Sequence, residues 1–407
     1  MVMKVYFGFN DIRQDGMGSE AMALMRTLKK ESVEVQPVHA WKHIDVPGYI
    51  EEFHPVFICD EPEDPGTENI IKRMVEYLNS IPENSIFSHF GSTNWACVIP
   101  YLRPDIKVVT SVHSITPSAL KIATAYKERI SSFIAISWEV EDRLRKFLPK
   151  EMESKISLVT NALNPEDYPE KDFSVKNERV KIVFFGRIED VTKGCDKIPR
   201  IAKKLKEKGL KFEWDIYGYF HWGYENRFYA LNKQYDVEDV INYKGCLQPY
   251  EVAQIIKDYD IFVLTSNHEG FGLALIEAMT VGLGCVASHI QNVTDHIIAD
   301  DKEGILCERN NIEAFAEAVY KLAVDPSCRI AMGKAAHEKV VREFSVRRQG
   351  KEYRAVFEKV DSNMNYNLIN PENDLDHFVV PEITKPHILA RILPLWFKKI
   401  LKRYLHN

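Results

Sequence analysis

The feature that most constrains the fold is an alternation of short apolar runs with longer amphipathic segments, which starts at the beginning of the chain. The short runs are rich in β-branched and aromatic residues, as buried parallel strands are; examples are VMKVYFGF, VEVQPVHA, KVVTSV and SFIAIS. Between them lie segments such as GSEAMALMRTLKKE, in which apolar residues recur at helical spacing. Strands that alternate with helices predict an α/β fold with a doubly wound parallel sheet.

The alternation is interrupted once and then resumes. Residues 164–178 (NPEDYPEKDFSVKNE) are rich in proline and charge, and a second series of strand-like runs follows with VKIVFFG, FEWDIYG, DIFVLTS and GCVAS. We therefore predict two Rossmann-like domains that face each other across a cleft, 1–165 and 166–345. Residues 361–407 should be a polar linker followed by a basic amphipathic helix.

Composition limits the classes of function. The net charge of −6 argues against bulk binding to nucleic acid. The seven cysteines are scattered and form no C-x-x-C pair, which favours reduced thiols in a cytosolic protein over a disulfide framework or a zinc site. The first residues are too polar for a secretory signal, and no apolar stretch reaches the length of a membrane span. We therefore expect a cytoplasmic protein.

The strongest functional signal is HEGFGLALIEAM at 268–279, directly after the strand-like run DIFVLTS. Two glycines mark the expected strand-to-helix junction, and the amides and positive dipole end of a helix start suit a diphosphate. Glu269 and Glu277 would lie about 12 Å apart if the whole span were helical. That separation suits hydroxyls at the sugar and ribose ends of a nucleotide sugar. Taken singly, either glutamate is better explained as a solvated or dipole-complementing residue.

The wider context resembles a known family. EGFGLALIEAM resembles the E-x7-E signature of retaining glycosyltransferases of the GT-B fold, most closely glycosyltransferase family 4. VFFGRIEDVTKGCD is similar to that family's GR…KG segment, GLGCVAS to GLPVVAS, and KISLVTNALNPEDY to KI-x-VIPNGVD-x-x-F. The resemblance extends to about residue 360 and is more specific in the second half. It implies a first domain that binds the acceptor and a second domain that binds the nucleotide sugar. It also implies that a helix over 346–360 crosses back to the first domain.

The resemblance also implies roles for individual residues. Arg187 and Lys193 would hold the donor diphosphate and stabilise it as the leaving group, because fixed cations offset phosphate charge. Glu269 would bind hydroxyls of the donor sugar, and His113, at a strand end of the first domain, would face that sugar. The remaining donor-binding candidates are Glu277 at the ribose, Phe271, Gly272 and Leu273 through their amides, Gly186, Ser266, and Gly16 and Gly18 of a glycine-rich first loop.

One departure from the family pattern concerns the nucleotide base. The family's G-x-G after the second strand of this domain is replaced by Gly218, Tyr219 and Phe220, near the place where relatives seat the base. The sequence therefore leaves open whether the donor carries UDP, GDP or ADP.

The resemblance implies that an α-linked sugar moves, with retention, from a nucleotide-diphosphate sugar to a hydroxyl of a glycan or lipid-linked acceptor. We expect a front-face reaction, because no carboxylate can be assigned beneath the anomeric carbon. No metal or other cofactor is expected, and the D-x-D pattern at 374–376 lies in the polar tail. Two alternatives stay open: a nucleotide-sugar epimerase on the same fold, which would release a free sugar, and a non-catalytic nucleotide-sugar-binding protein.

The C-terminal segment carries a separate prediction. Over 394–405, apolar and aromatic residues including Trp396 and Phe397 share one helical face, and basic residues including Lys398 and Lys402 share the other. A basic amphipathic helix with tryptophan predicts adsorption to an anionic membrane surface. Packing against the protein's own first domain, or against a dimer partner, explains the same pattern. The expected location is therefore cytoplasmic, with a peripheral position at a membrane face as one option.

Overall fold

The computed structural model of the protein describes residues 3–10, 12, 16–44, 46–60, 68–169, 171–174 and 178–362. The predicted amphipathic helix over 394–405 and the D-x-D pattern lie outside the described residues.

The first domain is built on a seven-stranded sheet in the order β3-β2-β1-β4-β5-β6-β7, in which every pairing is parallel. Its strands are β1 (Met3–Phe9), β2 (Val33–Trp41), β3 (Val56–Cys59), β4 (Ile86–His89), β5 (Lys107–Val112), β6 (Ile130–Ala135) and β7 (Ile156–Leu158). The central strands are buried along nearly their whole length, which explains their continuous apolar runs.

The second domain repeats this plan with a six-stranded parallel sheet in the order β10-β9-β8-β11-β12-β13. Its strands are β8 (Val180–Phe185), β9 (Phe212–Tyr217), β10 (Ile241–Tyr243), β11 (Ile261–Leu264), β12 (Gly284–Ser288) and β13 (Ile305–Cys307). In both sheets the strand order reverses direction once, between β1 and β4 and between β8 and β11. Open α/β sheets bind ligands at the carboxyl ends of the strands beside such a reversal.

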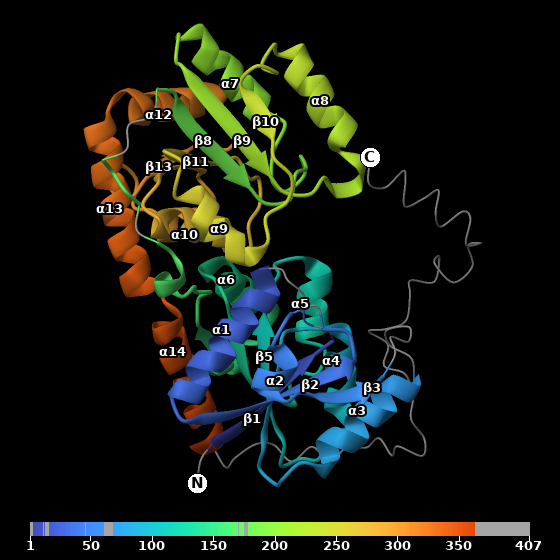
Figure 1. The fold of residues 1–407 in the computed structure, drawn as a ribbon. Coiled ribbons are helices and arrows are strands. Elements are labelled where there is room, and N and C mark those ends of the chain that lie inside the picture. Colours follow the sequence, from blue (N-terminus) through green and yellow to red (C-terminus); the bar gives the residue numbers. More distant parts are fainter. Residues whose placement is uncertain are drawn as a thin grey trace, which may run out of the picture.

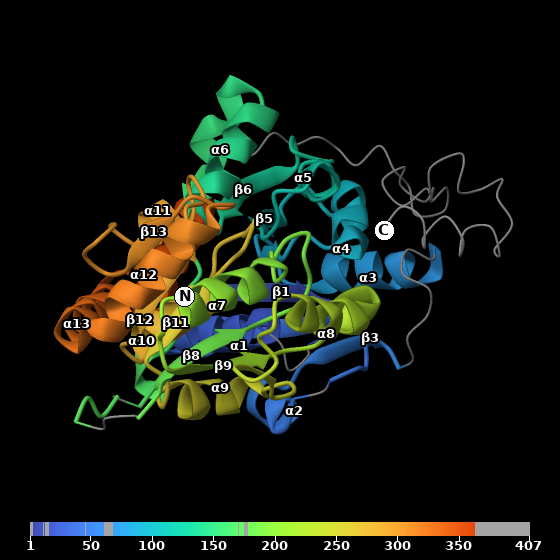
Figure 2. The same cartoon turned by 90° about the horizontal axis from the view of Figure 1, so that it is seen from above.

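Helices cover both faces of each sheet. The helices of the first domain are α1 (Gly16–Lys30), α2 (Tyr49–Phe53), α3 (Glu68–Ser80), α4 (Thr93–Val98), α5 (Pro117–Ala123) and α6 (Trp138–Phe147). Those of the second are α7 (Lys197–Glu207), α8 (Glu225–Gln234), α9 (Pro249–Ile256), α10 (Leu273–Thr280), α11 (Thr294–Ile297), α12 (Ile312–Val324) and α13 (Pro326–Glu343). The predicted layered architecture of two doubly wound domains is confirmed, and the second domain lies over the first (Figures 1 and 2).

The last described helix, α14 (Val346–Ser362), returns from the second domain and packs beside α1 on the first (Figure 1). Its apolar face enters the same buried cluster as β1 and α1, where Phe357 meets the ring of Phe7. The hydroxyl of Tyr353 lies 3.1 Å from that of Ser111. The helix therefore belongs to the core of the first domain although it follows the second in sequence.

Two chain segments that pass between the domains pair with each other. The amide of Leu163 donates to the carbonyl of Phe344 at 3.0 Å, and the amide of Val346 donates back to Leu163 at 2.9 Å. Nearby, the indole of Trp138 on α6 stacks on the imidazole of His296 on α11, with ring centroids 4.3 Å apart. These contacts join the two domains beside the segments that connect them.

Candidate functional site

The strand reversal in the second domain brings together two loops far apart in sequence. β8 and β11 are parallel neighbours, paired at Ile182 with Ile261, so the residues that follow both strands emerge at one edge of the sheet. The loop after β8 carries Arg187 and Lys193, and the loop after β11 carries Glu269. The fold therefore places the two predicted cations beside a predicted carboxylate.

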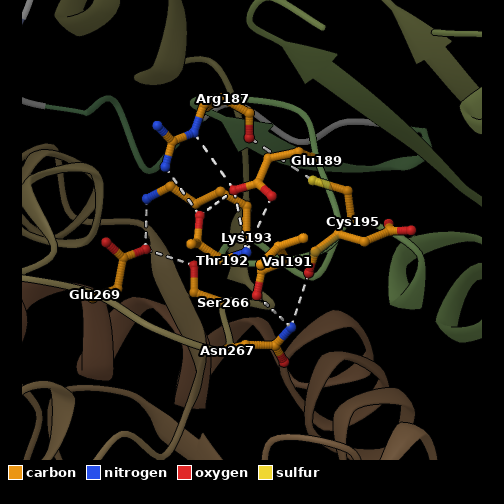
Figure 3. Close-up of polar contacts among 10 residues, drawn as sticks. Arg187, Glu189, Val191, Thr192, Lys193, Cys195, Ser266, Asn267 and Glu269 are labelled. Atoms are coloured by element: carbon orange, nitrogen blue, oxygen red, sulfur yellow. Dashed lines mark hydrogen bonds and ion pairs between the residues drawn. The ribbon is translucent and has the colours of Figure 1, made fainter. Parts of the chain in front are cut away.

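An ion pair joins the two loops. Lys193 Nζ lies 2.7 Å from Oε1 of Glu269, and the hydroxyl of Ser266 donates to the same oxygen at 2.5 Å (Figure 3). The Glu269 side chain is buried, whereas that of Lys193 is 20% exposed. An ammonium group has three N–H donors, and this contact uses one of them. Lys193 can therefore hold Glu269 and still donate to a ligand.

The guanidinium of Arg187 is held on the same loop. Its Nη2 donates to Thr192 Oγ1 at 3.0 Å, and its Nε lies 3.5 Å from Oε1 of Glu189 (Figure 3). Burial tends to raise the pKa of Glu189, but hydrogen bonds from Thr192 and the charge of Arg187 hold that pKa below its usual value. Neither Glu189 nor Thr192 was predicted, although both lie inside the GR…KG segment.

A buried lysine that the sequence reasoning did not single out fastens the two loops. Lys197 Nζ donates to the carbonyl of Thr265 at 2.8 Å and to Oδ1 of Asn267 at 2.5 Å. The backbone N–H of Asn267 in turn donates to the carbonyl of Thr192 at 2.7 Å. Gly194 fits tightly here, since a Cβ at its position would lie 2.5 Å from that same Thr265 carbonyl. At the first turn of an amphipathic helix, Lys197 looks in sequence like a solvated residue.

The predicted strand-to-helix junction is present, with Glu269 before the helix and Glu277 within it. Gly272, with φ 109°, is the N-cap, and α10 starts at Leu273. Glu269 therefore lies outside the helix, and the separation of about 12 Å expected for a fully helical span does not apply. A left-handed φ of this kind favours glycine, which explains why a glycine stands where the helix begins. The first amides of α10 have no acceptor within the helix and remain suited to an anion.

Glu277 lies on α10, separated along the chain from the ion pair. Its Oε1 accepts a hydrogen bond of 3.1 Å from the hydroxyl of Tyr168, which belongs to the segment between the domains. Burial raises the pKa of Glu277 to about 7, and the hydrogen bond from Tyr168 opposes that shift. The sequence did not predict a contact between Tyr168 and this carboxyl group.

His113 follows β5 of the first domain and lies next to Gly270, in the loop after β11. A Cβ placed on Gly270 would lie 3.3 Å from the carbonyl oxygen of His113. The imidazole packs at a tilt against Phe90, with centroids 5.0 Å apart, and burial lowers its pKa to about 4. Its Nε2 is buried and has no hydrogen-bond partner among the described residues. His113 is therefore neutral near pH 7 and has a ring nitrogen available.

The predicted glycines occupy different settings. Gly16 and Gly18 lie in the first turn of α1, not in a loop that precedes it, because the helix already begins at Gly16. Gly186 directly follows β8 and has φ 141°. It contacts Gly218 closely, since a Cβ added to Gly218 would lie only 1.7 Å from the carbonyl oxygen of Gly186. Phe271 is buried and packs against Phe344, so it can offer a ligand only its backbone.

The described residues contain neither a candidate metal site nor a candidate membrane-spanning helix. In the part of the chain that the structure describes, no three His, Cys, Asp or Glu side chains are grouped so that they could hold a metal ion. Likewise, none of the described helices is both long enough and apolar enough to cross a membrane.

Comparisons with known proteins indicate what the second domain and the whole fold are similar to. Residues 166–339 match the family model described as glycosyl transferases group 1. The chain is 27% identical over 254 residues to a putative colanic acid biosynthesis glycosyltransferase, WcaL, of Escherichia coli K12, covering 59% of this chain and 61% of that protein. It is 34% identical over 96 residues to a UDP-Gal:α-D-GlcNAc-diphosphoundecaprenol α-1,3-galactosyltransferase of Escherichia coli, covering 24% of each. The alignments thus span less than two thirds of either relative.

Solved structures extend the likeness to the whole fold. HepE of Anabaena, crystallised with UDP and glucose, superposes with a TM-score of 0.70 at 14% identity, covering 88% of this chain and all of that one. A glycosyltransferase of Rickettsia africae superposes with the same TM-score, 0.70, at 15% identity over 89% of this chain. The GT-B fold expected from the sequence is confirmed. Residues 166–339 therefore resemble glycosyl transferases group 1, within a two-domain fold shared with solved glycosyltransferases.

Proposed function

We propose that the protein is a retaining glycosyltransferase that moves an α-linked sugar from a nucleotide-diphosphate sugar to a hydroxyl of a glycan or lipid-linked acceptor. The observation that carries the proposal is the Lys193–Glu269 ion pair beside Arg187, at the strand reversal of the second domain, which resembles glycosyl transferases group 1. It combines cations suited to a diphosphate with a carboxylate suited to sugar hydroxyls.

The donor proposal begins with UDP. One relative is named for UDP-galactose, and HepE was crystallised with UDP, so a UDP-sugar is the first donor to test. The acceptor proposal draws on the names of the relatives, which include glycosyltransferases of colanic acid and amylovoran biosynthesis.

In the proposed reaction, the residues of this chain bind and stabilise. Arg187, Lys193 and the first amides of α10 would neutralise charge on the departing diphosphate, and Glu269 would orient the sugar through its hydroxyls. Neutral His113 would hydrogen-bond the same sugar from the first domain. The departing phosphate oxygen would take the acceptor proton. Since the two cations can offset the phosphate charge, the proposal requires no metal.

A donor panel tests the binding half of the proposal. UDP-, GDP- and ADP-sugars are added to the full chain and thermal unfolding is followed. A donor at 100 times its Kd should stabilise the native state by about 2.7 kcal/mol. The Lys193→Met variant should lose most of this shift, whereas Lys203→Met, at an exposed lysine on α7, should keep it. If no nucleotide sugar stabilises the wild type, the proposal is wrong.

Product analysis tests the transfer half. With the stabilising donor and candidate acceptors, NMR of the product should show an α-linked sugar, which is the retained configuration. A β-linked product would contradict retention. Release of a free sugar with inverted stereochemistry at a ring carbon would instead support the epimerase alternative.

The proposed location rests on the scattered cysteines and the polar first residues, and the proposed membrane contact rests on the sequence of 394–405. We propose a cytoplasmic protein whose terminal segment adsorbs to anionic membranes. Co-sedimentation with vesicles of anionic phospholipid should pellet the full chain more than a chain that ends at residue 385. Equal pelleting of the two would contradict the membrane contact.

A further inference from the structure

The carboxylate predicted to bind ribose is held by a residue from outside its own helix. Tyr168, whose hydroxyl donates to Oε1 of Glu277 at 3.1 Å, directly follows the 3₁₀ turn Pro165–Asp167 in the segment between the domains. Within the described part of the chain, no hydrogen bond reaches the second oxygen, Oε2. The tyrosine therefore engages one carboxylate oxygen and leaves the other available for a ligand.

The position of Tyr168 is fixed by its surroundings. Its amide donates to the carbonyl of Pro165 at 3.1 Å, which closes the turn, and its ring packs against the hydrophobic core that also contains Leu275 and Ile276 of α10. Earlier in the segment, Leu163 is paired with the chain that returns to α14. The hydroxyl is thus presented to Glu277 from a rigid support.

The hydroxyl itself is not required for this packing. A phenylalanine would fill the same space and leave Glu277 without the hydrogen bond. The contact with Glu277 therefore depends on the tyrosine hydroxyl alone.

We propose that Tyr168 is a positioning residue for the nucleotide ribose, which orients Glu277 so that its free oxygen accepts a hydrogen bond from a ribose hydroxyl. The inference rests on the proposed function, because it needs a ribonucleoside diphosphate donor. Tyr168 acts through Glu277 and need not touch the nucleotide. The ligand it favours is one with ribose hydroxyls over one without them.

Calorimetric titration of the full chain tests this with two ligands, UDP and 2′,3′-dideoxy-UDP. Tyr168→Phe should weaken the binding of UDP by about three- to tenfold, the worth of one ordinary hydrogen bond, and leave that of the dideoxy analogue unchanged. Glu277→Gln serves as the partner control: it should reduce the preference for UDP over the analogue. In a Glu277→Ala background, which lacks both oxygens, Tyr168→Phe should have no further effect on either Kd.

The outcomes separate this inference from the proposed function. If Tyr168→Phe weakens both ligands equally, or neither, the positioning role is refuted while nucleotide binding stands. If the wild type binds none of UDP, GDP and ADP, the proposed function is wrong and the inference is wrong with it. Should GDP or ADP bind in place of UDP, the corresponding dideoxy analogue provides the same comparison. Unchanged thermal unfolding of Tyr168→Phe shows that packing is intact.

Discussion

At the scale of single residues, the site is a set of paired charges held before any ligand arrives. Lys193 and Glu269 contact each other directly, and Arg187 is held by Thr192 and Glu189 (Figure 3). Preorganised charges of this kind need little rearrangement when charge develops on a leaving group. If these residues act on a donor as proposed, both loops must hold their positions, because the contacts join them.

A substitution at Glu269 tests this residue directly. Glu269→Gln keeps the shape and the contact with Ser266 but removes the charge that pairs with Lys193. We expect kcat/KM for sugar transfer to fall by about 10²–10³-fold, as for loss of one stabilising group in an active site. Steady-state kinetics against Glu317→Gln, an exposed glutamate on α12, provides the control. Full activity in Glu269→Gln would contradict the assignment.

Sequence patterns predicted these charged residues but not the ones that support them. Lys193 and Glu269 stand in motifs whose residue types suit phosphate and sugar. Lys197 and Asn267 were missed because their role depends on burial between loops 70 residues apart in sequence. Local pattern carries no information on such a contact.

At the scale of elements, the sequence predicted the central strands but not all of the edge strands. The sequence predicted the central strands well, because their burial on both faces requires continuous apolar runs. It did not mark β10 and β13, which have three residues each and lie at the edges of the second sheet. Short, partly exposed edge strands need no such pattern, so only the tertiary structure reveals them.

Gly194 provides a test at this scale, with Gly209 as its matched control. Both have left-handed backbone, with φ 61° and 74°, but a Cβ at Gly194 meets the Thr265 carbonyl whereas one at Gly209 meets nothing within 4 Å. Gly209→Ala should cost about 1–2 kcal/mol of unfolding free energy for the backbone conformation alone. Gly194→Ala should cost more than this. Equal losses in urea unfolding would show that the tight fit at Gly194 is unimportant.

At the scale of the whole molecule, α14 ties the end of the described chain to the first domain. Glu20 on α1 is buried and accepts a hydrogen bond of 3.2 Å from Gln349 on α14. Burial raises the pKa of Glu20 from its usual 4.5 to about 8. Between these values the folded protein binds more protons than the unfolded chain, so its stability decreases as pH rises.

Glu20→Gln should remove this dependence while keeping the hydrogen bond from Gln349. A single carboxyl contributes up to about 1.4 kcal/mol per pH unit, and Glu277, with its pKa raised to about 7, acts in the same direction. Thermal unfolding at pH 6 and pH 8 should therefore show a smaller loss of stability in Glu20→Gln than in the wild type. An identical loss in both proteins would mean that Glu20 ionises freely in the folded state.

We propose that one site, at the strand reversal of the second domain, binds the diphosphate of a sugar donor. The most direct measurement is a crystal structure of the full chain with the nucleoside diphosphate that binds most tightly. We predict that its phosphates contact Arg187, Lys193 and the first amides of α10, with the ribose hydroxyls at Glu277. A nucleotide bound elsewhere, with these side chains turned away from it, would contradict the account.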